Sequence, residues 1–315
     1  MLYPVATVVG IIASYLVAWA FAGAGSWRLL LGLAAVPAAV VLMLLRLPDT
    51  ARWYMLRGRT AEARRVLADL DPEADPDAEL AEIAAALSEE RGGGAKELLR
   101  TPWRRATVFV VVLGFFIQIT GINAIVYYSP RIFESMGFSG NAALLGLPAL
   151  VQVFGLAAVL TSLVTVDRFG RKPTLLTGIG IMVVANVLLI VVFLLSSSFG
   201  GVLTVLGFIG LVLFTVGFTF GFGSLVWVYA GESFPARLRA PGASAMLTAD
   251  LVANAIVAAV FLTMLNGLGG AGTFAVFGVL ALAAMVFVHR KAPETKGRRL
   301  EEIQQYWEND GQWVK

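Results

Sequence analysis

The sequence contains no cysteine and a single histidine, His289. A chain without cysteine forms no disulfide and performs no thiol chemistry. The one histidine ends the last apolar run, so neither a Cys/His zinc site nor a Ser-His-Asp triad is expected within the membrane. No nucleophile–base pair, metal-ligand spacing, phosphate loop or cofactor motif is found either. These absences argue against an enzyme, a bound metal and a cofactor.

Charged residues are also scarce. They form 14% of the chain, whereas hydrophobic residues form 58% and mean hydropathy is +0.80. This composition indicates an all-α membrane protein, because a helix of about 20 apolar residues crosses the bilayer with its backbone groups hydrogen-bonded. We predict eight transmembrane helices, over residues 3–23, 27–47, 106–129, 143–166, 173–195, 201–230, 242–265 and 270–289.

The basic residues gather on one side of these spans. Of the 24 Lys and Arg residues, all but Arg28 and Arg131 lie in the 46–105 loop, the loops at 167–173 and 232–241, or the C-terminal tail. The positive-inside rule then predicts a multi-pass protein of the cell membrane with both termini cytoplasmic. The net charge of +3 therefore reflects membrane topology, and no nucleic-acid partner is expected.

The 46–105 loop is the one long polar segment. Residues 60–70 and 77–91 read as short helices, with a break at 71–76 and an end at the glycines 92–94. One alternative is a solvated linker. The other is a helical bundle that packs under the membrane spans through its apolar positions, which are Val66, Leu67, Leu70, Leu80, Ile83 and Leu87.

The most informative stretch is 114–131, GFFIQITGINAIVYYSPR. It is apolar enough for a bilayer, yet it holds polar groups that need partners in hydrocarbon, which are Gln118, Thr120, Asn123, Tyr127 and Tyr128. Thr120, Asn123 and Tyr127 share one helix face. A break at Gly121 would bring Gln118 to Asn123, as happens at transporter binding sites. Uncharged amides and phenols suit a neutral polyhydroxy ligand, and the alternative is that they join helices.

Asp250 lies about eight residues into the seventh predicted span, one turn before Asn254 on the same face. A carboxylate there costs on the order of 3 kcal/mol on insertion scales. Three interpretations are open: it pairs with a basic group, it stays protonated, or it binds a cation or proton during transport.

A second charged group lies at 167–173, DRFGRKP, a tight turn between two spans. Gly170 permits the turn and Pro173 can begin the next helix. Its charges, Asp167, Arg168 and Arg171, can pair with those of the next predicted cytoplasmic loop, Glu232, Arg237 and Arg239. Ion pairs between the two loops would close the cytoplasmic side and release when it opens. The alternative is a plain stop-transfer charge cluster.

Five segments together resemble the sugar porter family of the major facilitator superfamily. They are LPDTARW at 47–53, QITGINAIVYY at 118–128, DRFGRKP at 167–173, ESFPARLR at 232–239 and PETKG at 293–297. They occur in the family's order, and the resemblance covers essentially the whole chain. Family members have twelve spans, so it implies that this chain corresponds to helices five to twelve and lacks the first four.

The resemblance also implies a substrate site. Gln118, Asn123 and Tyr127 match substrate-contacting positions of the family's helix seven. Other positions of the family's site carry different residues here, namely Pro4, Ile117, Gly155, Phe222 and Asp250. We take Gln118, Asn123, Tyr127, Phe222 and Asp250 as the candidate substrate-binding residues. The departures argue for a substrate other than an ordinary aldohexose.

The expected function is therefore transport of a sugar or polyol by alternating access, facilitative or coupled to protons by symport. The alternatives are a truncated, non-transporting membrane fragment and a transporter of another small hydroxylated metabolite. Oligomeric state is left open. The expected domains are residues 1–47, the last two helices of the N-terminal bundle; 48–105, an intracellular helical linker; 106–290, the C-terminal six-helix bundle; and 291–315, a cytoplasmic tail.

Overall fold

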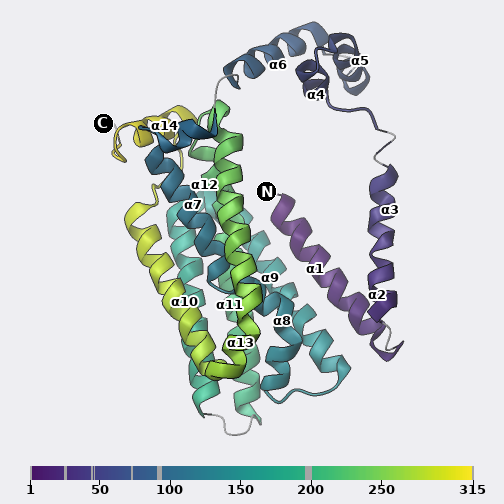
Figure 1. Ribbon diagram of the computed structural model, residues 1–315, viewed down its shortest axis with the longest axis vertical. Coiled ribbons are helices and arrows are strands. Elements are labelled where there is room, and N and C mark those ends of the chain that lie inside the picture. The colour runs from purple at the N-terminus through teal and green to yellow at the C-terminus, as the bar shows by residue number, and fades with distance from the viewer. Residues whose placement is uncertain are drawn as a thin grey trace. The chain divides into compact units, whose positions relative to one another are not determined.

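The computed structural model describes residues 2–24, 27–43, 45, 47–71, 74–90, 94–195 and 201–313, and the regular elements among them are all helices. The helices are α1 (Leu2–Ala20), η1 (Ala22–Ala24), α2 (Trp27–Leu33), α3 (Ala35–Met43), α4 (Ala51–Leu56), α5 (Thr60–Leu70), α6 (Pro76–Glu90), η3 (Ala95–Leu99), α7 (Arg104–Ile119), α8 (Ile122–Ser135), α9 (Asn141–Phe169), α10 (Arg171–Leu195), α11 (Val202–Phe220), α12 (Phe222–Glu232), α13 (Ala236–Lys291) and α14 (Leu300–Glu308) (Figure 1). They form two compact units, one of Met1–Gly25, Ala95–Pro235 and Arg239–Lys315, the other of Ser26–Gly94 and Ala236–Leu238.

The first unit holds the long apolar helices. Among the described residues, six stretches are long and apolar enough to cross a membrane: Tyr3–Ala20, Arg104–Ser135, Asn141–Phe169, Arg171–Leu195, Val202–Glu232 and Ala236–Lys291. The last of these bends at Gly269, which has φ 68°, into two limbs that run in opposite directions (Figure 1). It therefore covers both the seventh and the eighth predicted span.

The predicted span at 27–47 is not one continuous helix. Its described residues form α2 and α3, which are separated at Ala34. Pro37 has no backbone N–H, so the carbonyl of Leu33 has no helical partner there and the helix is interrupted. The apolar stretch Trp27–Leu42 is accordingly shorter than the six long ones. The structure thus supports an all-helical membrane fold but not the full count of eight continuous spans.

Glycines bring the helices of the first unit together. A Cβ built on Gly178 of α10 would lie 2.5 Å from the carbonyl oxygen of Gly217 on α11 and 2.6 Å from Cα of Gly221. Such distances leave no room for a side chain, so α10 and α11 pack backbone to backbone. The first helix, α1, packs along α9 on another face of this bundle (Figure 1).

The second unit has a small apolar core of its own. Ala51, Ala63 and Leu80 are buried, and Tyr54, Met55, Leu67 and Ile83 pack against them. Arg64 of α5 also pairs with Asp77 of α6 at 2.6 Å. This packing favours a folded helical cluster over a solvated linker, although Leu70 is exposed. The predicted helix end at 92–94 lies mostly outside the described residues, and the predicted domain boundaries stay a prediction.

Candidate functional site

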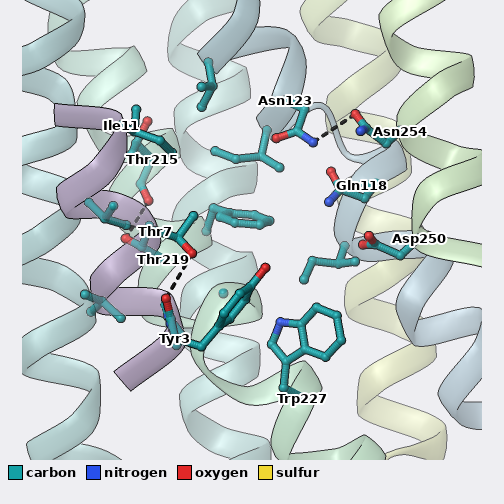
Figure 2. A pocket seen from close by; sticks show the side chains of 18 of the residues that line it. Tyr3, Thr7, Ile11, Gln118, Asn123, Thr215, Thr219, Trp227, Asp250 and Asn254 are labelled. Atoms are coloured by element: carbon teal, nitrogen blue, oxygen red, sulfur yellow. Dashed lines mark hydrogen bonds between the residues drawn. The ribbon is translucent and has the colours of Figure 1, made fainter. Parts of the chain in front are cut away.

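A cavity of about 470 Å³ lies within the first unit. It lies among helices far apart in the sequence, and Figure 2 shows α1 on one side and the Gln118, Asn123, Asp250 and Asn254 side chains on the other. The lining residues are Tyr3, Pro4, Thr7, Val8, Ile11, Ile117, Gln118, Ile122, Asn123, Val126, Tyr127, Gln152, Val159, Thr215, Phe218, Thr219, Gly223, Trp227, Leu247, Asp250, Leu251 and Asn254. Four of the five predicted substrate-binding residues are among them.

The predicted break at Gly121 is confirmed. Gly121 has φ 101°, and α7 ends at Ile119 while α8 begins at Ile122. Only glycine adopts this left-handed conformation without strain, and a Cβ here would lie 2.8 Å from the ring of Phe277. The break allows Gln118, at the end of α7, and Asn123, at the start of α8, to line the same cavity.

Asn123 and Tyr127 meet a third polar residue. Nδ2 of Asn123 donates to Oδ1 of Asn254 at 2.9 Å, and Nδ2 of Asn254 lies 3.5 Å from the Tyr127 hydroxyl. Thr120, expected on the same face, is instead fully buried and is not among the lining residues. The break rotates it away, because a face predicted for a straight helix does not continue through Gly121. Asn254 was missed as a site residue, although its spacing from Asp250 placed both on one face.

Asp250 is 5% exposed, and its Oδ1 has no hydrogen-bond partner. Oε1 of Gln118, whose amide faces Asp250 in Figure 2, is also buried without a partner. No lysine, arginine or histidine is among the described lining residues. Of the three interpretations of Asp250, pairing with a basic side chain of the cavity wall therefore finds no support.

The opposite wall carries polar groups that sequence reasoning missed. Tyr3 and Thr7 come from α1, and Gln152, which is 3% exposed, comes from α9. Thr215 and Thr219 come from α11, and Oγ1 of Thr215 has no hydrogen-bond partner. Gln152 could have been found from the sequence, because an amide in the middle of an apolar span needs a hydrogen-bond partner.

The predicted aromatic residue requires a correction. Phe222 is fully buried, lies 6.2 Å from Phe218 between ring centroids, and is not among the lining residues. The reason is the position of α12, which begins at Phe222 and turns Gly223 and Trp227, four residues apart, toward the cavity. Trp227 and Phe218 therefore supply the aromatic surface, and Tyr3 packs edge-on against Trp227 at 6.0 Å.

The charged turn at 167–173 forms a second polar cluster. Arg171 lies 3.2 Å from Asp167 and 3.9 Å from Glu232. The carboxylate of Glu294, in the PETKG segment, accepts the backbone N–H groups of Arg171 at 3.0 Å and Lys172 at 3.1 Å. Glu294 thereby caps the start of α10, where a negative charge is favourable.

The side chains of the other predicted gating residues, Arg168, Arg237 and Arg239, are exposed. The backbone carbonyl of Arg168 accepts Nζ of Lys296 at 2.5 Å, while the Arg168 side chain is exposed. Arg239 is exposed, and Arg237, also exposed, belongs to the second unit. Of the predicted inter-loop ion pairs, the structure shows the one between Arg171 and Glu232. Glu294 was missed because it is far from the turn in sequence.

The long apolar helices, which enclose a cavity with several polar side chains in its wall, define a multi-pass membrane protein with the fold of the major facilitator superfamily. The chain superposes on the partially occluded inward-open xylose transporter XylE from Escherichia coli with a TM-score of 0.78 and 26% identity, covering 94% of this chain and 63% of that one.

Comparison of sequences gives the family. Residues 1–307 match the family described as "Sugar (and other) transporter". The chain is 34% identical to the galactose-proton symporter of E. coli (strain K12) over 318 residues, 96% of this chain and 66% of that protein. It is 32% identical to the probable polyol transporter 6 of Arabidopsis thaliana over 335 residues, 98% of this chain and 68% of that protein. The chain belongs to the sugar transporter family of the major facilitator superfamily, a family of transporters rather than enzymes.

These relatives are longer than the chain, which spans about two thirds of their length.

Proposed function

We propose that the chain serves as a secondary transporter that moves a sugar or polyol across the membrane by alternating access. The observation that carries this proposal is the cavity, in which Gln118, Asn123 and Tyr127 converge from the two sides of the Gly121 break. A carboxamide donates and accepts hydrogen bonds, and so does a phenol, so the three groups suit a ligand covered with hydroxyls. The names of the similar galactose-proton symporter and polyol transporter point to the same ligand class.

The aromatic residues complete this ligand class. A sugar or polyol carries C–H groups between its hydroxyls, and Trp227 and Phe218 offer an apolar surface for them. The volume of about 470 Å³ lies in the range typical of small-molecule sites. The ligand would therefore lie between the amides of α7, α8 and α13 and the aromatic surface of α11 and α12.

Alternating access also needs a reversible closure, which we assign to the second polar cluster. The pair between Arg171 of α10 and Glu232 of α12 is long at 3.9 Å, and Nε of Arg171 and Oε2 of Glu232 have no partner. A loosely joined pair of this kind can open without breaking the cap that Glu294 forms on α10. We place this cluster and both termini on the cytoplasmic side, because Lys and Arg are concentrated there.

Proton coupling is a second part of the proposal. Asp250 is the one carboxyl group among the described lining residues, so it can bind and release a proton within the cavity. Uptake of labelled sugars and polyols, measured across pH in vesicles that carry the Asp250→Asn variant, tests this role. We expect a pH profile that is flatter than that of the unchanged chain, and an identical profile would remove Asp250 from coupling.

Ligand binding tests the site itself. The purified chain, reconstituted in nanodiscs, is titrated with D-galactose, D-xylose and myo-inositol, and binding is read by calorimetry and by the rise in melting temperature. We expect Asn123→Ala to weaken binding about tenfold, because one hydrogen bond to a ligand hydroxyl is lost.

The matched control is Asn141→Ala, which makes the same change at an exposed position of α9 outside the cavity. Equal binding by Asn123→Ala and the unchanged chain would overturn the site assignment. Absence of binding to D-galactose, D-xylose and myo-inositol, and also to amino-substituted sugars, would overturn the proposed ligand class.

A further inference from the structure

The cavity contains an imbalance between hydrogen-bond acceptors and donors. Oδ1 of Asp250 and Oε1 of Gln118 are both buried without a hydrogen-bond partner, and both residues line the cavity. Most buried side-chain polar atoms in proteins have a partner, so two unpartnered acceptors in neighbouring residues require an explanation. A ligand that brings donors to this corner supplies one.

The charge of the cavity points the same way. Asp250 is 5% exposed, and the described lining residues include no lysine, arginine or histidine to balance a carboxylate. The titratable groups that share the cavity with it are the phenols of Tyr3 and Tyr127, neither of which supplies a positive charge. A buried, ionised carboxylate is costly unless it is paired, so the missing positive charge would come with the ligand.

The remaining cavity wall suits hydroxyl groups. Asn123, Asn254 and Tyr127 are joined by contacts of 2.9 Å and 3.5 Å, and all three line the cavity beside the Asp250 and Gln118 corner. A neutral hydroxyl brings one donor and no charge to that corner, whereas an alkylammonium group brings three donors and the positive charge together.

We propose that the preferred ligand class is a hydroxylated amine, an amino sugar or aminocyclitol, whose ammonium group binds between Asp250 and Gln118. Its hydroxyl groups then meet Asn123, Asn254 and Tyr127. This inference rests on the proposed function and narrows it, because it adds a required charge to a sugar-like ligand.

Binding of matched ligands tests the inference. The chain in nanodiscs is titrated at about pH 6, where the amines are charged, with D-glucosamine, 6-amino-6-deoxy-D-glucose and D-glucose. We expect at least one amine to bind about tenfold or more tightly than glucose, because a hydrogen bond between charged groups is stronger than a neutral one. Asp250→Asn and Asp250→Gln should remove this preference, so that each variant binds the amines no more tightly than it binds glucose.

Two variants of Asp250 are used, so that the test still stands if one of them fails to fold. Glu308→Gln, which removes an exposed carboxylate on α14, is the control for loss of charge in general and should keep the preference. Glucose binding as tight as that of both amines, or an amine preference that survives in a folded Asp250 variant, would overturn the inference and leave the proposed function intact. Absence of binding by all three ligands, and by the sugars and polyol tested above, would overturn both.

Discussion

The cavity and the charged cluster around Arg171 both contain polar side chains, but these side chains differ in how far the protein itself satisfies their hydrogen bonds. In the cluster, the carboxylate of Glu294 accepts the backbone N–H groups of Arg171, Lys172 and Lys296 at 2.9–3.1 Å. In the cavity, acceptors on Gln118 and Asp250 and the hydroxyl of Thr215 have no partner. In the cluster, the Glu294 carboxylate is satisfied by backbone groups, and the unpartnered atoms are Nε of Arg171 and Oε2 of Glu232, which belong to the loose pair. In the cavity, the unpartnered atoms belong to the groups that we propose meet a ligand.

This difference indicates which changes alter stability and which alter binding. Removing a group that the protein has already satisfied leaves its partner unsatisfied, which destabilises the fold. Removing a group that faces an open cavity changes the ligand contact and has less effect on the free energy of unfolding. The loose pair between Arg171 and Glu232 is intermediate, since one end of it is fixed by the α9–α10 turn.

The largest effect is expected where the cavity depends on the backbone. Gly121→Ala places a Cβ 2.8 Å from Phe277 at φ 101°, so we expect a loss of roughly 2–4 kcal/mol in the free energy of unfolding. Melting temperature in nanodiscs measures it. Gly297→Ala is the control, because Gly297, in a turn of the same unit, also has positive φ, 71°, but its Cβ would meet nothing within 4 Å. Equal losses in both variants would show that the contact with Phe277 is unimportant.

The next largest effect is expected in the charged cluster. Glu294→Ala leaves the first N–H groups of α10 without their acceptor, so we expect a loss of about 1–3 kcal/mol. Thermal unfolding of the variant, compared with Glu301→Gln at an exposed position of α14, measures it. A melting temperature equal to that of the control would contradict the capping role of Glu294.

In the cavity, substitution of Asn254 should lower ligand affinity more than it lowers stability. Asn254→Ala removes the partner of Asn123, and we expect a loss of about 1 kcal/mol in stability, together with a fall in ligand affinity of about tenfold or more. Titration and thermal unfolding of the same preparation separate the two effects. A larger loss of stability in Asn254→Ala than in Glu294→Ala, with ligand binding unchanged, would show that the cavity and the cluster do not differ in this way.

The smallest effect is expected at the exposed end of the cluster. Asp167 lies 3.2 Å from Arg171, but its side chain is 76% exposed, so Asp167→Asn should change stability by less than about 0.5 kcal/mol. Thermal unfolding at low and high salt measures it, and any difference should shrink with salt. A loss as large as that of Glu294→Ala would show that the Arg171–Asp167 pair, rather than Glu294, holds this turn.

Much of the architecture could be predicted, because bilayer length and hydropathy act on local sequence. The long apolar helices, the short helix at 60–70 and the break at Gly121 follow from composition, spacing and glycine chemistry, and the structure confirms them. Asn123, Tyr127 and Asp250 were found because polar groups stand out in apolar spans. The span predicted at 27–47 is divided in the described residues into α2 and α3, a division that hydropathy does not predict because it does not register the missing N–H of Pro37.

Sequence alone determined that this is a helical membrane protein with uncharged polar groups, one acid and a helix-breaking glycine within its spans, because each of these is a local property of the chain. Tertiary structure alone decided which groups meet. It turned Phe222 into the bundle and Trp227 toward the cavity, paired Asn123 with Asn254 from a helix 131 residues away, and capped α10 with Glu294. The physical reason is that burial and hydrogen bonding depend on which helix faces pack together, and that packing is a property of the whole bundle.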